Sequence, residues 1–260
     1  RMGNSFILKK DLESEFSGPG GDVTIPDTTN GLPVTSIGDN AFQRKSNLTS
    51  VTIASSITNI GNLAFHSCTS LTNVAIGSGV IRIGEAAFYS CTQLTGITIP
   101  NGVTSIGSSG FTLCSKLTSI TIPTSVTNIG SSAFTSCTSL TNITIPNGVT
   151  TIASQTFYHC SNLTSATIPS SIASIGTWAF AACTSLTNVT VPNSVTNIES
   201  NAFYRCTSLT NLTIGNSVTS IGDGAFAVCT SLADVMIPNS VTTLGRSAFS
   251  SCASLTNVAI

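Results

Sequence analysis

Nine cysteines are the side chains of this sequence with the greatest capacity for chemistry, because thiolates bind metals and pair as disulfides. They recur at one constant interval from Cys68 to Cys252, so each stands alone in its part of the chain. A metal site needs several ligands close together, and stacked repeats would hold neighbouring Cβ atoms parallel instead of directing them at each other. The sequence therefore predicts buried free thiols that pack as small hydrophobic groups, with no metal and no cofactor.

Histidine and serine offer no catalytic arrangement either. His66 and His159 stand at different places in the repeat, and neither has a carboxylate near it in sequence. No serine lies in a G-x-S-x-G motif, and the GPGG at residues 18–21 precedes a predicted strand where a phosphate loop would open a helix. We therefore expect no catalytic residues and predict that the protein is not an enzyme.

The sparse charge of the chain argues against two classes of partner. Charged residues make up 7% of the 260 residues, the net charge is −1, and eleven of the nineteen charged side chains lie in residues 1–45. Nucleic acid would require a basic stripe, and an anionic membrane would require a basic cluster or amphipathic helix. The chain has neither feature and no apolar run long enough to span a bilayer, so the sequence predicts no nucleic-acid binding and no membrane insertion.

A strict repeat positions all of these residues. Phenylalanine recurs ten times from Phe42 to Phe249, always at the interval that separates Phe42 from Phe65. A leucine follows each phenylalanine at a fixed offset, and a cysteine follows nine of them. The segment 117–139 shows the unit, LTSITIPTSVTNIGSSAFTSCTS. Such a fixed period is typical of a solenoid, in which neighbouring units stack and bury apolar residues that no single unit can bury.

Each unit predicts two short strands and one turn of helix. Residues 117–122 alternate apolar and polar side chains and end at Pro123, and residues 125–129 form a second β-branched run. Gly130 then turns the chain, a serine can cap a helix, and Phe134 and Cys137 have nearly helical spacing. At about 4.8 Å per stacked strand, ten such coils would form a rod about 48 Å long.

The N-terminal segment, residues 1–33, departs from this pattern. Val34 follows Ile25 by nine positions, whereas Ile57 follows Ile53 by four. We predict that residues 1–33 form an N-terminal capping coil and that residues 34–260 form a ten-repeat solenoid, together a single domain. Because the sequence stops in the middle of a repeat, we also expect a longer parent protein.

The string I-P-x-S-V-T-x-I-G-x-x-A-F-x-x-C-x-x-L resembles the BspA-like family of leucine-rich repeat surface proteins over residues 22–260. The resemblance implies an α/β repeat solenoid, curved and right-handed, with a parallel sheet on one face and short second strands and helical turns on the other. It also implies secretion or display on a microbial cell, a role in adhesion or protein contact, and no catalytic residues. Departures from the string predict locally looser coils: Gly77 and Gly215 in place of the proline after the strand, Glu199 and Ala153 in place of the turn glycine, and Thr156 and Gly110 in place of the alanine before phenylalanine.

The first strand of each unit offers the main candidate binding face. Side chains alternate along a strand, so Val189 and Val191 should point inward and their polar neighbours outward. Stacking would repeat the outward positions as two files of hydroxyl and amide groups: Ser119, Asn142, Ser165, Asn188, Asn211, Asp234 and Asn257, and Thr121, Thr144, Thr167, Thr190, Thr213 and Met236. The alternative is that these groups merely keep a parallel sheet soluble.

A second candidate surface is aromatic. Tyr89, Tyr158 and Tyr204 each follow the repeated phenylalanine directly, so they share one flank of the rod. Tyrosine is favoured in contact surfaces, although ordinary packing over the helical turn explains the same pattern.

Three functions remain open. The leading hypothesis is an extracellular module for adhesion or protein interaction, whose partner is an extracellular protein or glycan of unknown identity. The second is an architectural rod or spacer, whose open ends would favour end-to-end self-association. The third is binding to ice or another crystal surface through a regular file of threonines, namely Thr104, Thr127, Thr150, Thr196, Thr219 and Thr242.

Overall fold

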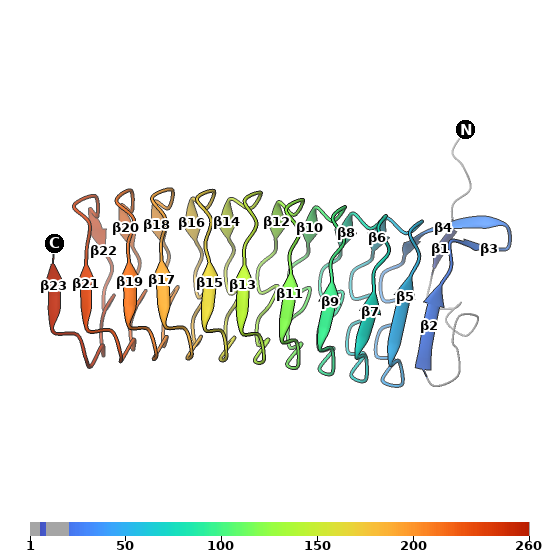
Figure 1. The fold of residues 1–260 in the computed structure, drawn as a ribbon, viewed down its shortest axis with the longest axis horizontal. Coiled ribbons are helices and arrows are strands. Elements are labelled where there is room, and N and C mark those ends of the chain that lie inside the picture. Colours follow the sequence, from blue (N-terminus) through green and yellow to red (C-terminus); the bar gives the residue numbers. More distant parts are fainter. Residues whose placement is uncertain (1–5, 9–20, 260) are drawn as a thin grey trace.

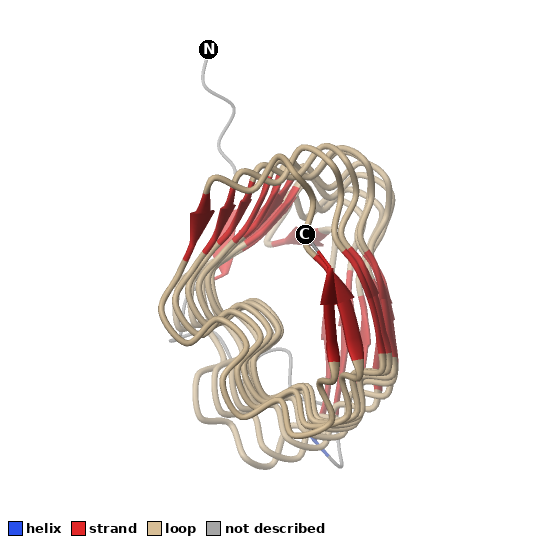
Figure 2. Cartoon of the chain, turned by 90° about the vertical axis from the view of Figure 1, so that its left-hand side faces the viewer, coloured by secondary structure: helices blue, strands red, loops and turns tan. Residues whose placement is uncertain are grey.

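Stacked coils of equal length build the whole molecule, as the phenylalanine period predicts. The computed structural model describes residues 6–8 and 21–259, which form a β-solenoid of about ten coils. Successive coils lie side by side along the long axis (Figure 1), and strands occupy two sides of each coil (Figure 2). The pairings between coils are parallel and join equivalent positions of the repeat, as in Asn73, Gly96 and Ser119.

The first strands of the coils lie on one side of the rod, and we call their outer surface the strand face. From the N-terminal end they are β2 (Asp22–Ile25), β5 (Ser50–Ile53), β7 (Asn73–Ala75), β9 (Gly96–Thr98), β11 (Ser119–Thr121), β13 (Asn142–Thr144), β15 (Ser165–Thr167), β17 (Asn188–Thr190), β19 (Asn211–Thr213), β21 (Asp234–Met236) and β23 (Asn257–Ala259). Strands β2 to β11 form one five-stranded sheet. The later strands pair two by two, as β13 with β15, β17 with β19 and β21 with β23.

The second strands are shorter and form the other side of the rod. They are β4 (Leu32–Ile37), β6 (Asn59–Ile60), β8 (Arg82–Ile83), β10 (Ser105–Ile106), β12 (Asn128–Ile129), β14 (Thr151–Ile152), β16 (Ser174–Ile175), β18 (Asn197–Ile198), β20 (Ser220–Ile221) and β22 (Thr243–Leu244). Strands β4 to β12 belong to one sheet and β14 to β22 to another.

At the N-terminal end, the longer connection after Ile25 forms a hairpin. Strand β3 (Thr28–Thr29) pairs antiparallel with β4, and β1 (Phe6–Leu8) adds to β4 in parallel. The predicted capping coil also includes residues 1–5 and 9–20, which lie outside the described residues. The division of the chain into residues 1–33 and 34–260 stays a prediction.

The repeated phenylalanines form a continuous column through the core. Neighbouring rings from Phe42 to Phe249 lie 5.1–5.6 Å apart between centroids, with interplanar angles of 2–18°. The rings from Phe42 to Phe226 are almost completely buried. Stacked aromatic pairs contribute about 0.5–1.5 kcal/mol each beyond the burial of their area. This column therefore stabilises every contact between coils.

The predicted helical turn around each phenylalanine is wrong, and with it the α/β class. Between residues 22 and 259 the structure contains strands, turns and loops but no helix. The residues two positions before and two positions after each phenylalanine have left-handed backbone angles, as at Leu63 (φ 55°) and Ser67 (φ 59°) beside Phe65. An α-helix needs consecutive right-handed residues, so left-handed residues on both sides of each phenylalanine prevent it. The predicted right-handed curvature of the rod stays a prediction.

The cysteines bind the coils together. Their prediction as buried groups is confirmed for eight of the nine, and Cys252 in the last coil is partly exposed. Each thiol donates a hydrogen bond to the carbonyl oxygen of the phenylalanine in the preceding coil, at 3.0–3.3 Å. Burial raises the pKa of the thiols from Cys91 to Cys252, to about 12 for Cys114. The thiols are thus hydrogen-bond donors as well as small packing groups.

One junction between coils is weaker than the others. Among the described coils, both sheets are interrupted together only between residues 117–139 and 140–162, where β11 does not pair with β13 and β12 does not pair with β14. The amide of Gly130 donates a hydrogen bond to the carbonyl oxygen of Ile106 in the preceding coil, at 2.9 Å, and that of Gly176 to Ile152, at 2.8 Å. The amide of Ala153 makes no such bond to Ile129. The largest ring spacing, 5.6 Å, joins Phe134 to Phe157 at this junction. The looser coil predicted from Ala153 and Thr156 is therefore observed. The one predicted from Glu199 is not, because its amide donates to the carbonyl oxygen of Ile175 at 2.9 Å as the turn glycines do.

Candidate binding face

The strand face presents the polar files that the alternation of side chains predicts. In β13, Asn142 and Thr144 are exposed and Ile143 between them is buried, and β17 repeats this pattern. All eleven predicted site residues on these strands are exposed: Ser119, Thr121, Asn142, Thr144, Ser165, Thr167, Asn188, Thr190, Asn211, Thr213 and Asp234. The structure therefore brings them together on one surface. Their role in binding stays a prediction.

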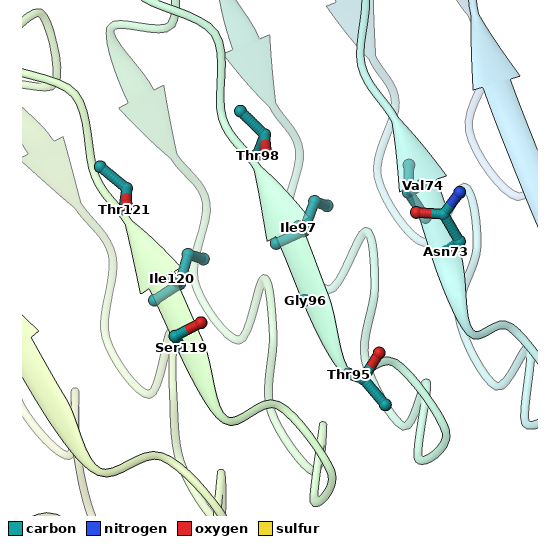
Figure 3. Close-up of a pocket in the computed structure, with 9 residues that line it drawn as sticks. All are labelled: Asn73, Val74, Thr95, Gly96, Ile97, Thr98, Ser119, Ile120 and Thr121. Atoms are coloured by element: carbon teal, nitrogen blue, oxygen red, sulfur yellow. The ribbon is translucent and has the colours of Figure 1, made fainter.

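A depression interrupts one of these files at Gly96. It has a volume of about 360 Å³ and extends across β7, β9 and β11 (Figure 3). Gly96 is paired with Asn73 on one side and Ser119 on the other, so a file of side chains loses one member there. A Cβ atom at Gly96 would have no atom within 4 Å. The file of side chains thus lacks one member at the depression, while the backbone ladder continues beneath it.

Polar groups around this depression have hydrogen-bonding capacity that the protein itself does not use. Asn73, Thr98, Ser119 and Thr121 line it, and within the described part of the chain their side chains make no hydrogen bond. Some side chains further along the face are engaged: Asn142 donates to the Thr141 hydroxyl at 3.2 Å, for example. Others, such as those of Thr144, Ser165 and Thr190, likewise make no hydrogen bond within the described residues, so the unused capacity is not confined to the surroundings of Gly96.

Amides elsewhere in the same file are also engaged with one another. Asn211 donates to the side-chain oxygen of Asn188 at 2.6 Å, across two paired coils. The sequence prediction treated Asn188 and Asn211 as equivalent to the rest of the file and passed over Gly96. The signal that would have found the depression was glycine at a position that asparagine or serine occupies in the neighbouring coils.

The predicted aromatic flank is divided into two groups. Tyr89 stacks on His66, with ring centroids 4.8 Å apart and an interplanar angle of 4°. Tyr158 and Tyr204 both contact Trp178, at 6.1 and 5.3 Å between centroids. The sequence prediction missed Trp178 because it precedes its phenylalanine by two positions, whereas the tyrosines follow theirs by one. All of these rings except His159, which adjoins Tyr158, are partly buried.

All members except Thr150 of the threonine file considered for ice binding are engaged in joining coils. The hydroxyls of Thr104, Thr127, Thr196, Thr219 and Thr242 donate to carbonyl oxygens of the preceding coil, at 3.2–3.4 Å. A hydroxyl has one hydrogen to donate, so these groups keep only acceptor sites for an external ligand. Their arrangement favours a structural role.

The titratable side chains do not gather into a reactive centre in the part of the chain that the structure describes. No three of its His, Cys, Asp and Glu residues lie close enough to hold a metal ion. The pKa of His66 is lowered, chiefly by burial, and its ring nitrogen lies 2.9 Å from the hydroxyl of Ser67. Over residues 6–8 and 21–259, no helix has the length and apolar character to cross a membrane.

Comparison with known families gives a match over most of the chain. The family described as the BspA-type leucine-rich repeat region, in 6 copies, matches residues 35–164 and 150–260. Comparison with curated proteins gives no match.

Solved structures of bacterial leucine-rich repeat proteins are similar to this chain. The leucine-rich repeat protein of T. pallidum is 33% identical over 65% of this chain and 79% of its own, with a TM-score of 0.61. A leucine-rich repeat protein from Bacteroides ovatus is 27% identical over 91% of this chain and 80% of its own, with a TM-score of 0.52. The pneumococcal vaccine antigen PcpA, at 21% identity over 97% of this chain and 74% of its own and a TM-score of 0.62, shares the fold.

Proposed function

The chain belongs to the BspA-type leucine-rich repeat family, and on that premise we propose that it is a non-enzymatic module that binds an extracellular protein or glycan through its strand face. The module acts in adhesion or protein interaction, in secreted form or on the cell surface. The observation that carries the proposal is the pair of exposed polar files on one long side of the rod. Solenoids commonly use such extended surfaces for binding.

The chemistry of the described residues supports a binding role over a catalytic one. His66 and His159 lie on different coils, and each contacts a tyrosine instead of a carboxylate. The thiols from Cys91 to Cys229 are buried and have raised pKa values, whereas a nucleophilic cysteine needs a lowered pKa and access to substrate. A face made mostly of hydroxyls and amides provides recognition without activating a nucleophile.

The test is binding of the purified chain to a panel of immobilised extracellular proteins and glycoproteins. A variant with Asn142, Thr144, Asn188 and Thr190 changed to lysine places four bulky cations on the strand face. The matched control has Asn128, Thr151, Asn197 and Thr243 changed to lysine, which adds the same charge to exposed positions of the second strands.

We expect saturable binding that the strand-face variant loses and the control variant keeps. Equal loss in both variants would instead indicate a general effect of charge. Binding that survives in the strand-face variant would contradict the proposal. Circular dichroism and thermal unfolding of the three proteins show whether the fold is intact.

The second candidate function is an architectural rod in which stacking is itself the role. The hydroxyl ladder supports it, because side chains such as Thr127 and Thr219 are engaged in bonds between coils. In this case the chain would bind no partner in the panel and would associate end to end. Light scattering that shows growth of linear particles with concentration would favour the rod over the binding module.

A further inference from the structure

We propose that the depression at Gly96 binds one uncharged sugar residue of a glycan. The inference rests on the proposed function, since it assigns a ligand class to one part of the strand face. The depression lies in the five-stranded sheet formed by β2, β5, β7, β9 and β11. The floor is therefore a rigid backbone ladder on both sides of β9.

The size of the depression matches a small ligand. Its volume of about 360 Å³ lies at the lower end of the range of roughly 300–1,000 Å³ that is common for small-ligand pockets. Figure 3 shows Gly96 between the side chains of Asn73 and Ser119, with Thr98 and Thr121 further along the strands. A ring-sized group can thus sit in the space of the missing side chain, with polar groups around its edge.

The lining selects for a neutral ligand that is rich in hydroxyl groups. The Asn73 amide offers two donor hydrogens and an acceptor oxygen, and each hydroxyl of Thr98, Ser119 and Thr121 offers one donor and acceptor sites. No charged side chain lines the depression, so an anionic or cationic ligand would lose hydration without gaining an ion pair. Sugar hydroxyls are both donors and acceptors and match this lining.

The small apolar part of the lining also suits a sugar. Val74, Ile97 and Ile120 contribute it, and they are 3%, 7% and 8% exposed. A peptide would typically anchor itself through an aromatic or arginine side chain in a deep pocket, and this floor offers no such pocket. The C–H groups of a sugar ring need only a shallow apolar contact, which the floor provides. A glycan is therefore favoured over a peptide.

The polar lining of the depression has unused hydrogen-bonding capacity. The side chains of Asn73 and Ser119 make no hydrogen bond within the described chain, whereas Asn188 and Asn211 bond to each other. A ligand at Gly96 gains hydrogen bonds without breaking any within the protein. At Asn188 and Asn211 it would have to displace such a bond first.

The experiment uses a glycan array that carries neutral, sialylated and sulfated oligosaccharides. The test variant is Gly96→Asn, which restores the side chain that neighbouring coils carry and has open space for it. The matched control is Ser165→Asn, which adds the same residue at an exposed position of β15, away from the depression. A second variant, Ser119→Ala, removes one hydroxyl from the lining.

We expect the native chain to bind neutral glycans in preference to acidic ones, and Gly96→Asn to weaken that binding at least tenfold. Ser165→Asn should bind as the native chain does, and Ser119→Ala should weaken binding several-fold. Absence of any neutral glycan among the ligands, a preference for acidic glycans, or full binding by Gly96→Asn would each overturn the proposal.

The outcome is separable from the test of the strand face as a whole. The four lysine substitutions lie on β13 and β17, outside the lining of the depression. If they abolish protein binding while Gly96→Asn changes nothing, the sugar site is wrong and the binding module stands. If Gly96→Asn abolishes glycan binding while the lysine variant keeps every protein partner, the sugar site stands and the wider face is wrong.

Discussion

The thiol of Cys137 donates a hydrogen bond to the carbonyl oxygen of Phe111 in the preceding coil, at 3.2 Å. The same carbonyl oxygen also accepts a hydrogen bond from the amide of Cys114 in its own coil, at 3.2 Å. Two coils are thus joined at one buried acceptor, and eight other thiols make the equivalent bond to a phenylalanine carbonyl. Because only the protonated thiol can donate, the protons on these sulfurs are linked to the stability of the stack.

Raising the pH above about 9 is expected to destabilise the protein. Burial raises the pKa of Cys114 and Cys160 to about 12, from the ordinary value of 9.0. Between these values the unfolded chain releases thiol protons that the folded chain retains, so the free energy of unfolding falls as the pH rises. Each such thiol contributes a slope of up to about 1.4 kcal/mol per pH unit. Urea unfolding at a series of pH values measures the slope.

The control for this prediction is a variant with Cys114→Ala and Cys160→Ala. Its absolute stability will be lower because two cavities are created, but its slope above pH 9 should be shallower than that of the native chain. An unchanged slope would show that these thiols do not cause the pH dependence.

Val228→Gly is expected to stabilise the protein despite the loss of a side chain. Val228 has a φ of 62°, in the left-handed region that β-branched residues avoid. Left-handed geometry costs an L-residue about 1–2 kcal/mol, and glycine removes that cost while losing about 0.5–1 kcal/mol in the entropy of the unfolded chain. Chemical unfolding should show a net gain of up to about 1 kcal/mol. Val228→Ala, which keeps the Cβ atom, should gain less, and a more stable alanine variant would contradict the explanation.

The left-handed residues also explain why the sequence led to a wrong prediction of a helical turn. The period of phenylalanine was sufficient to predict the parallel strands and the core column. The helix was predicted because Ala133, Phe134 and Cys137 have nearly helical spacing. Left-handed residues are usually signalled by glycine, yet this chain has glycine at only one of these positions, Gly224. Stacking imposes that geometry, so the local sequence carries little sign of it.

The amide of Ala153 is expected to exchange with solvent faster than its equivalents. The amides of Gly130 and Gly176 donate hydrogen bonds to the preceding coil at the junctions on either side, and the amide of Ala153 makes no such bond at its own junction. Exchange of a bonded amide requires local opening, whereas an unbonded one exchanges without it. Hydrogen exchange measured by nuclear magnetic resonance compares the three sites directly. Equal protection at Ala153 and Gly176 would contradict an interrupted ladder at this junction.

Tyr204→Ala is expected to change the fluorescence of the only tryptophan, while Tyr89→Ala leaves it unchanged. The ring centroids of Trp178 and Tyr204 lie 5.3 Å apart. Tyr89 contacts His66 instead, and both of these residues lie on coils distant from Trp178. Loss of one aromatic pair should also reduce stability by about 0.5–1.5 kcal/mol. Emission spectra of the two variants and the native chain provide the measurement, and an equal change in both variants would argue against two separate groups.

The candidate site was predictable in outline and not in detail. Alternation along the strands predicted that Asn142, Thr144 and their equivalents would be exposed, since a strand with one buried face must expose the other. Three features were not predictable in this way. Gly96 was passed over because the files were identified by their side chains, and glycine has none. Trp178 was missed because its offset from phenylalanine differs from that of the tyrosines. The hydrogen bond between Asn188 and Asn211 was missed because their rotamers depend on neighbours in the folded chain.

The interrupted junction beside Ala153 makes the rod mechanically uneven. Ladders on two sides resist flexing along a solenoid, and where both stop at the same coil the flexural stiffness drops. Under tension or shear we expect deformation to concentrate between Ile129 and Ala153, with the segments on either side tilting as stiff arms. The Gly96 depression lies on one arm and the Tyr158, Trp178 and Tyr204 group on the other, so bending would change the angle between these two surfaces.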